Sequence, residues 1–464
     1  MSQSSNVLIV GAGKAGLLLL TELNQPKYKN YQVVGFIDDD PEKLGTKIET
    51  LFVLGNTEQI PEIVEKFEIG LSIIAIPSAT GKTITRIVDI IHQTSSSFMI
   101  VPPIFQNLKI NTISAPRRIS VRDLIRAPIE NVLTEASMKE IENYTILITG
   151  TAGSIGSEIC IQLAGCFPKQ IIGLDVAETP LFELANQMNQ NHKKITFIPA
   201  LANIRDEKRL SKIIRKYKPD IIYHCAAFKH VGMMEQFPHE CVKNNIQGSI
   251  NLIKIALEEK IERLVFVSTD KAVNPINVMG ISKRIIEKYV LAQNSNDTKF
   301  MIVRFGNVLE SSGSAIPIFK KQIENGGPVL LTDERMERFF MTITEAAQLV
   351  VQASILGKGG ELFVLDMGEP YKMLDIIHKL FQIYDYDKDD IKIENIGIRP
   401  GEKLTEELFH DFEEPELSQH NRIYICNIDN DEISEDFLKE IDKFVEEVDQ
   451  MTKEEISVKM LDFV

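Results

Sequence analysis

Two strand–glycine-turn–helix patterns, with their first glycines 139 residues apart, constrain the fold of this chain more than any other feature. In the first, the apolar run Val7–Val10 leads into a turn with glycines at Gly11, Gly13 and Gly16; in the second, Thr145–Ile148 leads into Gly150-Thr151-Ala152-Gly153-Ser154-Ile155-Gly156. Such glycines let the backbone approach a pyrophosphate at a helix N-terminus. Strand patterns also alternate with helical patterns of about ten to fifteen residues, which indicates parallel sheets covered by helices. The sequence therefore predicts an α/β chain with two Rossmann-like, doubly wound parallel-sheet domains, the second carrying a small C-terminal lobe.

The same patterns suggest the domain boundaries. Residues 1–130 are predicted as the first domain, 131–143 as a linker, and 144–430 as the second domain, with its C-terminal lobe beginning at about residue 305. An acidic helical tail follows at 431–464, and we expect its charges to form a solvated face.

Composition excludes several classes of protein. A net charge of −15 over 464 residues argues against a nucleic-acid groove, which needs a basic stripe. No run of 18 or so apolar residues occurs, so the sequence contains no membrane span. The five cysteines are odd in number and lack metal-type spacing, which favours reduced thiols in the cytoplasm and no metal site. We expect a soluble cytoplasmic protein.

The first glycine turn leaves two interpretations open. The strand Val33–Ile37 ends in Asp38-Asp39-Asp40, where an acid can accept a hydrogen bond from a ribose hydroxyl. No cluster of catalytic residue types accompanies this turn. Binding of a nucleotide and a ligand-free Rossmann fold are therefore equally compatible with the residues.

The second glycine turn is followed by further residues that suit a dinucleotide. Asp175 ends the strand Ile171–Leu174, and a carboxylate there would bind ribose hydroxyls and repel a 2′-phosphate, which favours NAD over NADP. The alternative is a solvated acid at a strand end. Ala226 and Ala227 end another predicted strand, where small side chains would leave room for the cofactor. Asn244 and Asn245 lie in the next helical region and suit either a structural role or a proton relay.

Three proton-handling residues follow a further predicted strand. Leu264–Val267 leads into Ser268 and then Thr269, Asp270 and Lys271, while Met279 and Lys283 lie one helical turn apart on the next helix and so share a face. The alternative interpretation is an ordinary polar turn before a helix.

These strings resemble one family closely: the nucleotide-sugar 4,6-dehydratases of bacterial polysaccharide and glycoprotein synthesis, which are extended short-chain dehydrogenases/reductases. Within it the chain is most similar to the C5-retaining UDP-N-acetylglucosamine 4,6-dehydratases, because Met279 stands where a YxxxK pair has its tyrosine. The segment Asp38–Gly45 also resembles the CoA-binding-like domain that precedes the catalytic domain in these proteins. The strings that carry the resemblance are TGTAGSIGSE (Thr149–Glu158), AAFKHV (Ala226–Val231), STDKAVNP (Ser268–Pro275), MGISK (Met279–Lys283), RFGNVL (Arg304–Leu309), GSAIP (Gly313–Pro317), GKGGELFVLDMGEP (Gly357–Pro370) and RPGEKLTEEL (Arg399–Leu408).

The resemblance implies dehydration of UDP-N-acetylglucosamine to a 4-keto-6-deoxy sugar nucleotide through a transient C4 ketone, with NAD bound throughout. Asp270 would protonate the leaving C6 oxygen and Lys271 would remove the C5 proton, so Asp270 must carry a proton and Lys271 must be neutral when they act. Thr269 would hydrogen-bond the C4 oxygen, and Lys283 would hold the nicotinamide ribose. Met279 has no proton to give, so Asp270, or Thr269 with a water, is our hypothesis for the acceptor of the C4 proton.

The resemblance also implies residues that bind the two nucleotides. Gly150, Gly153, Ser154, Ile155, Gly156, Asp175, Asn203, Ile204, Ala226, Ala227 and Lys283 are the expected cofactor-binding residues, and Lys229, His230, Asn307, Arg338, Arg399 and Glu402 the expected substrate-binding residues. Arginines can make two-pronged contacts with phosphate oxygens. For Lys229 and Glu402 an ordinary surface role is equally compatible with the sequence.

The chain departs from the family pattern at several positions. Ala152 stands where a third glycine is common, Glu310 stands where glycine usually follows NVL, and Asn203 replaces an aspartate near the adenine. Relatives of this type usually carry a membrane-spanning bundle ahead of the first domain. We therefore expect a cytoplasmic location, or the cytoplasmic face of the inner membrane if such a segment has been removed, and a homo-oligomer. The alternatives are a C5-inverting dehydratase, a 4-epimerase of a UDP-sugar, and a non-catalytic nucleotide-binding regulator.

Overall fold

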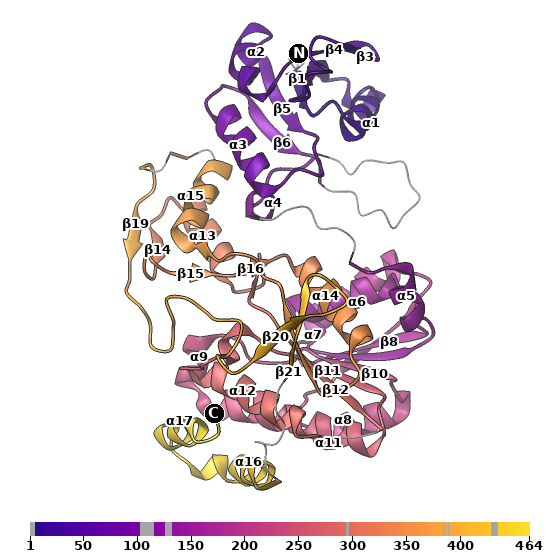
Figure 1. Ribbon diagram of the computed structural model, residues 1–464, viewed down its shortest axis with the longest axis vertical. Coiled ribbons are helices and arrows are strands. Elements are labelled where there is room, and N and C mark those ends of the chain that lie inside the picture. The colour runs from indigo at the N-terminus through magenta and orange to yellow at the C-terminus, as the bar shows by residue number, and fades with distance from the viewer. Residues whose placement is uncertain are drawn as a thin grey trace. The chain divides into compact units, whose positions relative to one another are not determined.

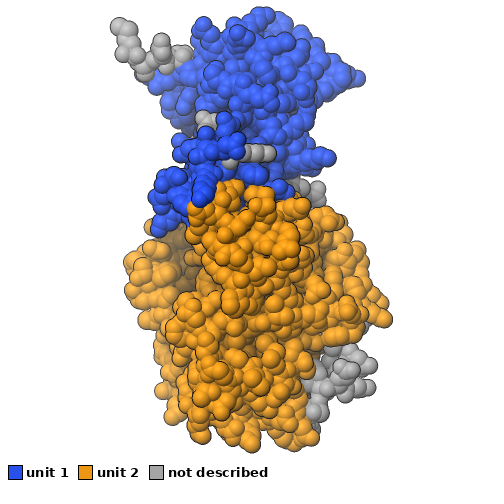
Figure 2. Space-filling model, turned by 90° about the vertical axis from the view of Figure 1, so that its left-hand side faces the viewer, with its two compact units in different colours: residues 1–131, 319–329, 375–392 blue, residues 132–318, 330–374, 393–464 orange. Residues whose placement is uncertain are grey.

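The computed structural model describes residues 5–102, 116–125, 132–293, 297–384, 386–387, 389–427 and 435–464. It contains two compact units (Figure 2): unit 1 comprises residues 1–131, 319–329 and 375–392, and unit 2 comprises residues 132–318, 330–374 and 393–464. Two segments of the predicted C-terminal lobe thus belong to unit 1 with the N-terminal residues. The predicted boundary at residues 130 and 131 lies outside the described residues.

Unit 1 is built around a six-stranded sheet in the order β3-β4-β2-β1-β5-β6, in which β3 alone runs antiparallel to its neighbour (Figure 1). Helix α3 shows why its sequence is helical, since Ile84, Ile87, Val88 and Ile91 recur at helical spacing and are buried on one face. The elements are β1 (Ser5–Val10), α1 (Lys14–Leu23), β2 (Tyr31–Ile37), β3 (Lys47–Ile48), β4 (Leu51–Gly55), α2 (Ile60–Lys66), β5 (Ile69–Ile74), α3 (Gly81–His92), β6 (Ser97–Ile100), α4 (Val121–Ile125) and most of α15 (Met373–Ile383).

Unit 2 is built around a nine-stranded sheet in the order β20-β21-β17-β12-β11-β10-β7-β8-β9, in which β21 runs antiparallel to both of its neighbours, β20 and β17. Its strands are β7 (Thr145–Thr149), β8 (Gln170–Asp175), β9 (Thr196–Leu201), β10 (Ile221–His224), β11 (Arg263–Val267), β12 (Lys299–Arg304), β17 (Glu361–Leu365), β20 (Glu414–Leu417) and β21 (Ile423–Asn427). Its helices are α5 (Glu135–Ile141), α6 (Ser154–Ala164), α7 (Glu178–Asn191), α8 (Glu207–Tyr217), α9 (Val231–Gln236), α10 (Pro238–Cys241), α11 (Gly248–Glu258), α12 (Val278–Leu291), α14 (Ile343–Leu356), α16 (Glu435–Glu447) and α17 (Lys453–Leu461).

The remaining elements are short. They are helix α13 (Ala315–Glu324) and three two-stranded sheets, which pair β13 (Asn307–Val308) with β16 (Phe340–Met341), β14 (Val329–Leu331) with β19 (Ile393–Asn395), and β15 (Glu337–Arg338) with β18 (Tyr371–Lys372). No helix among the described residues is both long and apolar enough to cross a bilayer.

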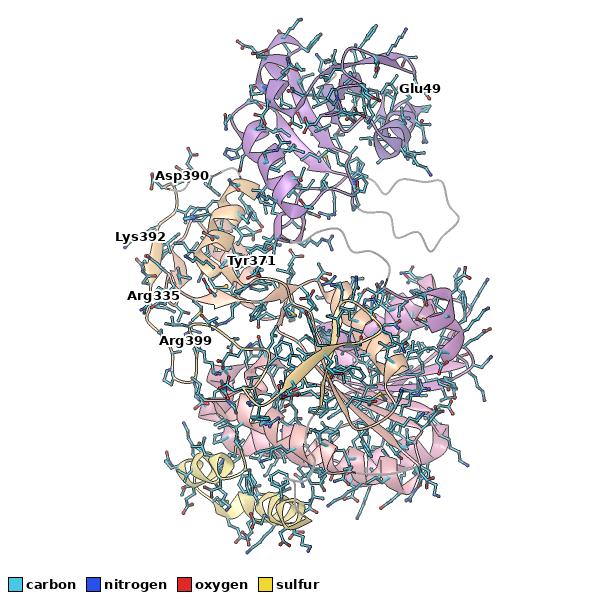
Figure 3. The ribbon with its side chains drawn as sticks, viewed as in Figure 1. Glu49, Arg335, Tyr371, Asp390, Lys392 and Arg399 are labelled. Carbon is cyan, nitrogen blue, oxygen red and sulfur yellow. The ribbon has the colours of Figure 1, made fainter. Side chains whose placement is uncertain are left out.

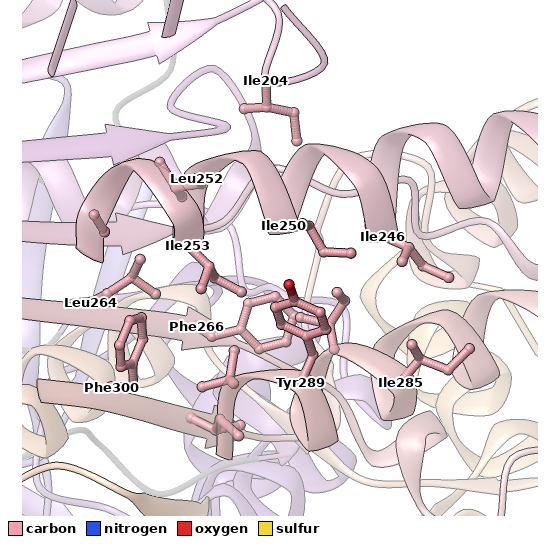
Figure 4. Packing of buried hydrophobic residues seen from close by; sticks show 14 of the residues in the cluster. Ile204, Ile246, Ile250, Leu252, Ile253, Leu264, Phe266, Ile285, Tyr289 and Phe300 are labelled. Carbon is pink, nitrogen blue, oxygen red and sulfur yellow. The ribbon is translucent and has the colours of Figure 1, made fainter. Parts of the chain in front are cut away.

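Apolar side chains cover both faces of the large sheet. One face packs against α8, α11 and α12, and Figure 4 shows Ile250 and Ile253 of α11 packed toward Phe266 of β11 and Tyr289 of α12. The other face packs against α6, α7 and α14, with Ile159, Leu184 and Leu349 buried there. Strands covered on both faces by helices are typical of parallel α/β sheets. The predicted fold class, with two Rossmann-like parallel sheets, is confirmed.

The acidic tail has an apolar inner side. Ile441 and Phe444 of α16, Ile456 and Met460 of α17, and the following Phe463 are buried in the same cluster as α11 and α12. The tail is therefore an integral part of unit 2, with its charges on the outer side of a packed helix pair.

Candidate functional site

The second glycine turn has a backbone that only glycine adopts easily. Gly150 has a φ of +70°, and a Cβ on it would lie 2.6 Å from the Ala226 nitrogen at the end of β10. Helix α6 begins at Ser154, and its N-cap residue Gly153 provides no side-chain hydrogen bond to the first-turn N–H groups. Those N–H groups can therefore bind a phosphate anion. The turn fits the pyrophosphate of a dinucleotide.

Asp175 holds this turn in place. Its Oδ2 accepts a hydrogen bond from the Ala152 nitrogen at 2.8 Å, and its Oδ1 accepts one from the Ala177 nitrogen at 2.9 Å. The Ala152 contact uses the backbone, so replacement of the usual glycine by alanine leaves it intact. Unit 1 contains the same arrangement, in which Asp38 Oδ2 accepts from the Ala12 nitrogen at 2.8 Å.

Three other expected cofactor-binding residues, Asn203, Ile204 and Ala227, follow β9 and β10. Asn203 Oδ1 accepts a hydrogen bond from the Arg205 nitrogen at 3.0 Å and so closes the turn after β9. Ile204 is buried and packs against Gly248, on which a Cβ would lie 2.7 Å from Ile204 Cδ1. Ala227 follows Ala226 just beyond β10 and is partly buried.

Thr269, Asp270 and Lys271 form one hydrogen-bonded cluster at the carboxyl end of β11. The Asp270 side chain is fully buried, and its Oδ1 accepts hydrogen bonds from Thr269 Oγ1 and from Lys271 Nζ, both at 2.9 Å. Its Oδ2 is buried and has no hydrogen-bond partner among the described residues. A Cβ on Gly306 would lie 3.0 Å from that oxygen, so glycine keeps the space beside the carboxylate open. The cluster can move protons between three groups.

Asn307 fixes the amine of this cluster. Lys271 Nζ donates a hydrogen bond to Asn307 Oδ1 at 3.0 Å, in addition to the one it donates to Asp270. The sequence suggested that Asn307 reaches the substrate, whereas the structure gives it a direct contact with Lys271. Asn307 thus orients the amine relative to Asp270.

Lys283 lies beneath the end of the same strand. Its Nζ donates a hydrogen bond to the Val267 carbonyl oxygen at 2.9 Å and lies 4.6 Å from the centre of the Phe266 ring. Burial lowers the pKa of Lys283 to about 8. Met279, one turn earlier on α12, is 3% exposed and packs in the apolar core.

A polar layer under the strand ends is structural. His224 hydrogen-bonds Thr149 Oγ1 at 2.6 Å and Ser249 Oγ at 2.9 Å, and burial, followed by the charge of Lys283, lowers the pKa of His224 to about 3. Asn245, in a π-helical turn at Val242–Gln247, donates hydrogen bonds to the Phe228 carbonyl oxygen and to Ser282 Oγ. Of the two interpretations left open for Asn245, these contacts support the structural one.

The expected substrate-binding residues of the β10 loop lie on an exposed segment. Lys229 Nζ is 3.4 Å from Ser311 Oγ. The His230 ring occupies the space beside Gly313, where a Cβ would lie 2.7 Å from its Cε1. Glu310, which replaces the usual glycine, has a φ of +59°, and this left-handed backbone explains why glycine is common there.

Arg338 is buried, and its guanidinium group forms hydrogen bonds with backbone carbonyl oxygens of the same chain. It donates hydrogen bonds to the carbonyl oxygens of Lys403 at 2.8 Å and Leu404 at 2.9 Å. Arg338 therefore holds the loop that carries Glu402. Arg399, labelled in Figure 3, is exposed at the start of that loop, and Glu402 Oε2 is buried without a hydrogen-bond partner among the described residues.

One residue near the Thr269–Lys271 cluster was not predicted from the sequence. Glu406 is 5% exposed, and its Oε1 lies 3.8 Å from Lys271 Nζ. The only sequence feature that pointed to Glu406 was its position inside the string Arg399–Leu408. Glu406 and Glu407 are adjacent residues of the same type, so the sequence does not distinguish them. In the structure, Glu406 is buried and Glu407 is exposed.

Comparisons with known proteins place the chain in one family. Residues 146–428 match the family described as polysaccharide biosynthesis protein, and residues 1–102 match the family described as CoA-binding domain. The capsular polysaccharide biosynthesis protein CapD of Staphylococcus aureus is 40% identical over 460 residues, or 97% of this chain and 75% of CapD. The UDP-N-acetylglucosamine 4,6-dehydratase (inverting) of Campylobacter jejuni is 35% identical over 267 residues, or 56% of this chain and 76% of that protein.

A solved structure agrees with the sequence comparisons. The X-ray structure of Pen from Bacillus thuringiensis superimposes with a TM-score of 0.57 at 30% identity, covering 69% of this chain and 99% of Pen. The family match over residues 146–428 includes the second glycine turn and the Thr269–Lys271 cluster. This chain belongs to the polysaccharide biosynthesis protein family.

Proposed function

We propose that the chain is an NAD-dependent 4,6-dehydratase that converts UDP-N-acetylglucosamine to a 4-keto-6-deoxy product with retention of configuration at C5. The observation that carries this proposal is the hydrogen-bonded Thr269–Asp270–Lys271 cluster around a buried Asp270, in the same sheet whose strand β7 leads into a glycine turn suited to a dinucleotide. The 4,6-dehydratase among its relatives supports the reaction class. The capsular relative supports a role in polysaccharide synthesis.

The reaction requires a temporary ketone at C4, because the C5 hydrogen becomes acidic only beside a carbonyl. A bound nicotinamide supplies this chemistry by taking a hydride from C4 and later returning it to C6. The uncapped N-terminus of α6 would hold the pyrophosphate. Asp175 would accept from the ribose hydroxyls, and its charge at this position favours NAD over NADP.

The cluster handles two protons, one from the C4 hydroxyl group and one from C5. As the C4 hydroxyl is oxidised, its proton passes to Thr269 and on to Asp270 through the 2.9 Å hydrogen bond between them. Lys271 then removes the C5 proton, a C5–C6 double bond forms, and the C6–O bond breaks as Asp270 protonates the departing oxygen. Water leaves, and Lys271 returns a proton to C5 on the same face when hydride arrives at C6. The side chains end as they began.

Lys283 and Met279 bear on two parts of this scheme: how the cofactor is held and where the C4 proton goes. Lys283, fixed by the Val267 carbonyl, would hold the nicotinamide ribose and place positive charge near C4. Met279 carries no proton and is packed in the core, so the C4 proton must leave by another route than the usual tyrosine. This substitution favours retention over inversion at C5 and weighs against a 4-epimerase, which normally needs the tyrosine.

Incubation with UDP-N-acetylglucosamine in deuterated water tests the proposal. We expect a product that has lost one water and gained one deuterium at C5 with the original configuration. An inverted C5 would identify the inverting dehydratase, and a C4 epimer without loss of water would identify an epimerase. Absence of any turnover would support the non-catalytic regulator.

A further inference from the structure

Glu406 occupies an unusual position beside the proposed base. Its side chain is almost fully buried, with Oε1 3.8 Å from Lys271 Nζ and 4.0 Å from Arg338 Nη2. Its Oε2 is buried and has no hydrogen-bond partner among the described residues. Burying a carboxylate in this way is costly unless nearby cations compensate for its charge.

A purely structural buried ion pair in the same unit has a different geometry. Arg304 Nη2 lies 2.8 Å from Glu287 Oε2, and Arg304 Nη1 lies 2.6 Å from Glu413 Oε2, with all three side chains fully buried. In that network the charges meet at hydrogen-bond distance. Glu406 Oε1 instead lies 3.8 Å and 4.0 Å from its two cations, beyond hydrogen-bond distance. Its Oε2 has no hydrogen-bond partner among the described residues, so this arrangement is a poor one for stability alone.

The charges around Lys271 suggest what Glu406 does. Lys271 Nζ lies between two carboxylates, Asp270 Oδ1 at 2.9 Å and Glu406 Oε1 at 3.8 Å. In the proposed reaction Asp270 receives the C4 hydroxyl proton before the elimination and gives it to the leaving oxygen. Glu406 transfers no proton in this scheme, so its carboxyl group can face the Lys271 amine while that amine gains the C5 proton and becomes an ammonium ion.

We propose that Glu406 is a positioning residue that stabilises the ammonium ion formed on Lys271 during removal of the C5 proton. Arg338 supports it, because the guanidinium group holds the carbonyl oxygens of Lys403 and Leu404 just before it in the chain. The inference rests on the proposed dehydratase function. It adds a second anion, contributed by a segment about 135 residues away in sequence, to the machinery that handles the C5 proton.

Glu406→Gln tests this inference, because it removes the charge with little change in shape. Oxidation at C4 should continue, while exchange of C5 with deuterated water and product formation should slow roughly 100-fold, as is typical when one preorganised electrostatic partner is lost. Reduced nicotinamide should therefore accumulate and be visible by its near-ultraviolet absorbance. Glu406→Asp, which keeps the charge, should restore most of the C5 exchange.

Glu407→Gln is the matched control. Glu407 is exposed, accepts a hydrogen bond from Asn274 at 3.0 Å and pairs with Lys403 at 3.6 Å, so its neutralisation should leave both half-reactions unchanged. If Glu406→Gln folds and slows both half-reactions equally, or neither, the inference is wrong. If Glu406→Gln does not fold, Glu406→Asp decides: it should slow C5 exchange more than C4 oxidation, and equal effects would overturn the inference. Failure of the wild-type protein to release water would instead reject the dehydratase function itself.

Discussion

At the scale of single residues, the Lys271 amine has contacts from three parts of the chain: Asp270, Asn307 and Glu406. Thr269, Asp270 and Lys271 are consecutive after a strand, so their proximity could be predicted. The contacts of Lys271 with Asn307 and Glu406 span long stretches of chain and depend on which strands become neighbours. A pattern of neighbouring residues in the sequence does not predict such contacts.

Asp270→Asn should slow oxidation at C4 as well as loss of water, because the proposed C4 proton ends on this carboxylate. We expect a loss of about 10²- to 10⁴-fold, the usual contribution of a general acid or base. Rapid-mixing measurement of reduced nicotinamide checks the first step. Asp436→Asn, on an exposed side chain of α16, is the control. C4 oxidation at the wild-type rate in Asp270→Asn would remove Asp270 from that step.

Lys283 should make the stability of the cofactor-free protein depend on pH. Its folded-state pKa of about 8 lies below the ordinary 10.5, so the unfolded chain binds more protons between these values. The free energy of unfolding should therefore rise with pH across this window, by on the order of 3 kcal/mol from this group. Urea unfolding of wild type and Lys283→Met at several pH values isolates the effect. Parallel curves for the two proteins would contradict it.

At the scale of elements, the glycine turns and the strand–helix alternation were predictable because each is set by neighbouring residues. Gly150, with its positive φ, and the uncapped start of α6 follow directly from the motif. The antiparallel strands β20 and β21 and the three two-stranded sheets were not predicted. Their strands are short, and their pairing is decided by tertiary contacts.

Gly150→Ala should weaken NAD binding at least 10-fold, because its Cβ would meet the Ala226 backbone and strain a left-handed turn. Calorimetric titration with NAD measures the effect. Gly232→Ala is the matched control, because a Cβ there meets no atom within 4 Å. Equal NAD affinity in both variants would show that this turn does not hold the cofactor.

At the scale of the whole molecule, segments that are far apart in the sequence belong to the same compact unit. Helix α15 follows the catalytic segments in the chain, yet in unit 1 Lys379 Nζ donates to Thr85 Oγ1 at 3.0 Å and Gln382 Nε2 donates to Asp89 Oδ1 at 2.7 Å. The tail helices likewise return to cover α11 and α12. From its acidic charge we predicted a tail separate from the second domain, whereas its apolar residues pack into the core of unit 2.

Phe463→Ala should destabilise unit 2 by about 3–5 kcal/mol, the usual cost of removing a buried phenylalanine side chain. Phe463 is 2% exposed and packs against Phe437 and Phe444, whereas nearby Leu461 is 55% exposed. Leu461→Ala should therefore change the free energy of unfolding by less than about 1 kcal/mol. Chemical denaturation compares them. Similar small losses in both variants would mean that the tail is not part of the core.

The central claim is that hydrogen removed from C4 of the sugar returns to C6 of the same molecule. The most direct test uses UDP-N-acetylglucosamine carrying deuterium at C4, with the site of the label in the product read by nuclear magnetic resonance. We expect deuterium at C6 of a 4-keto-6-deoxy product, with no net consumption of NAD. Deuterium retained at C4 of an epimer, or reduced cofactor released in proportion to product, would contradict it.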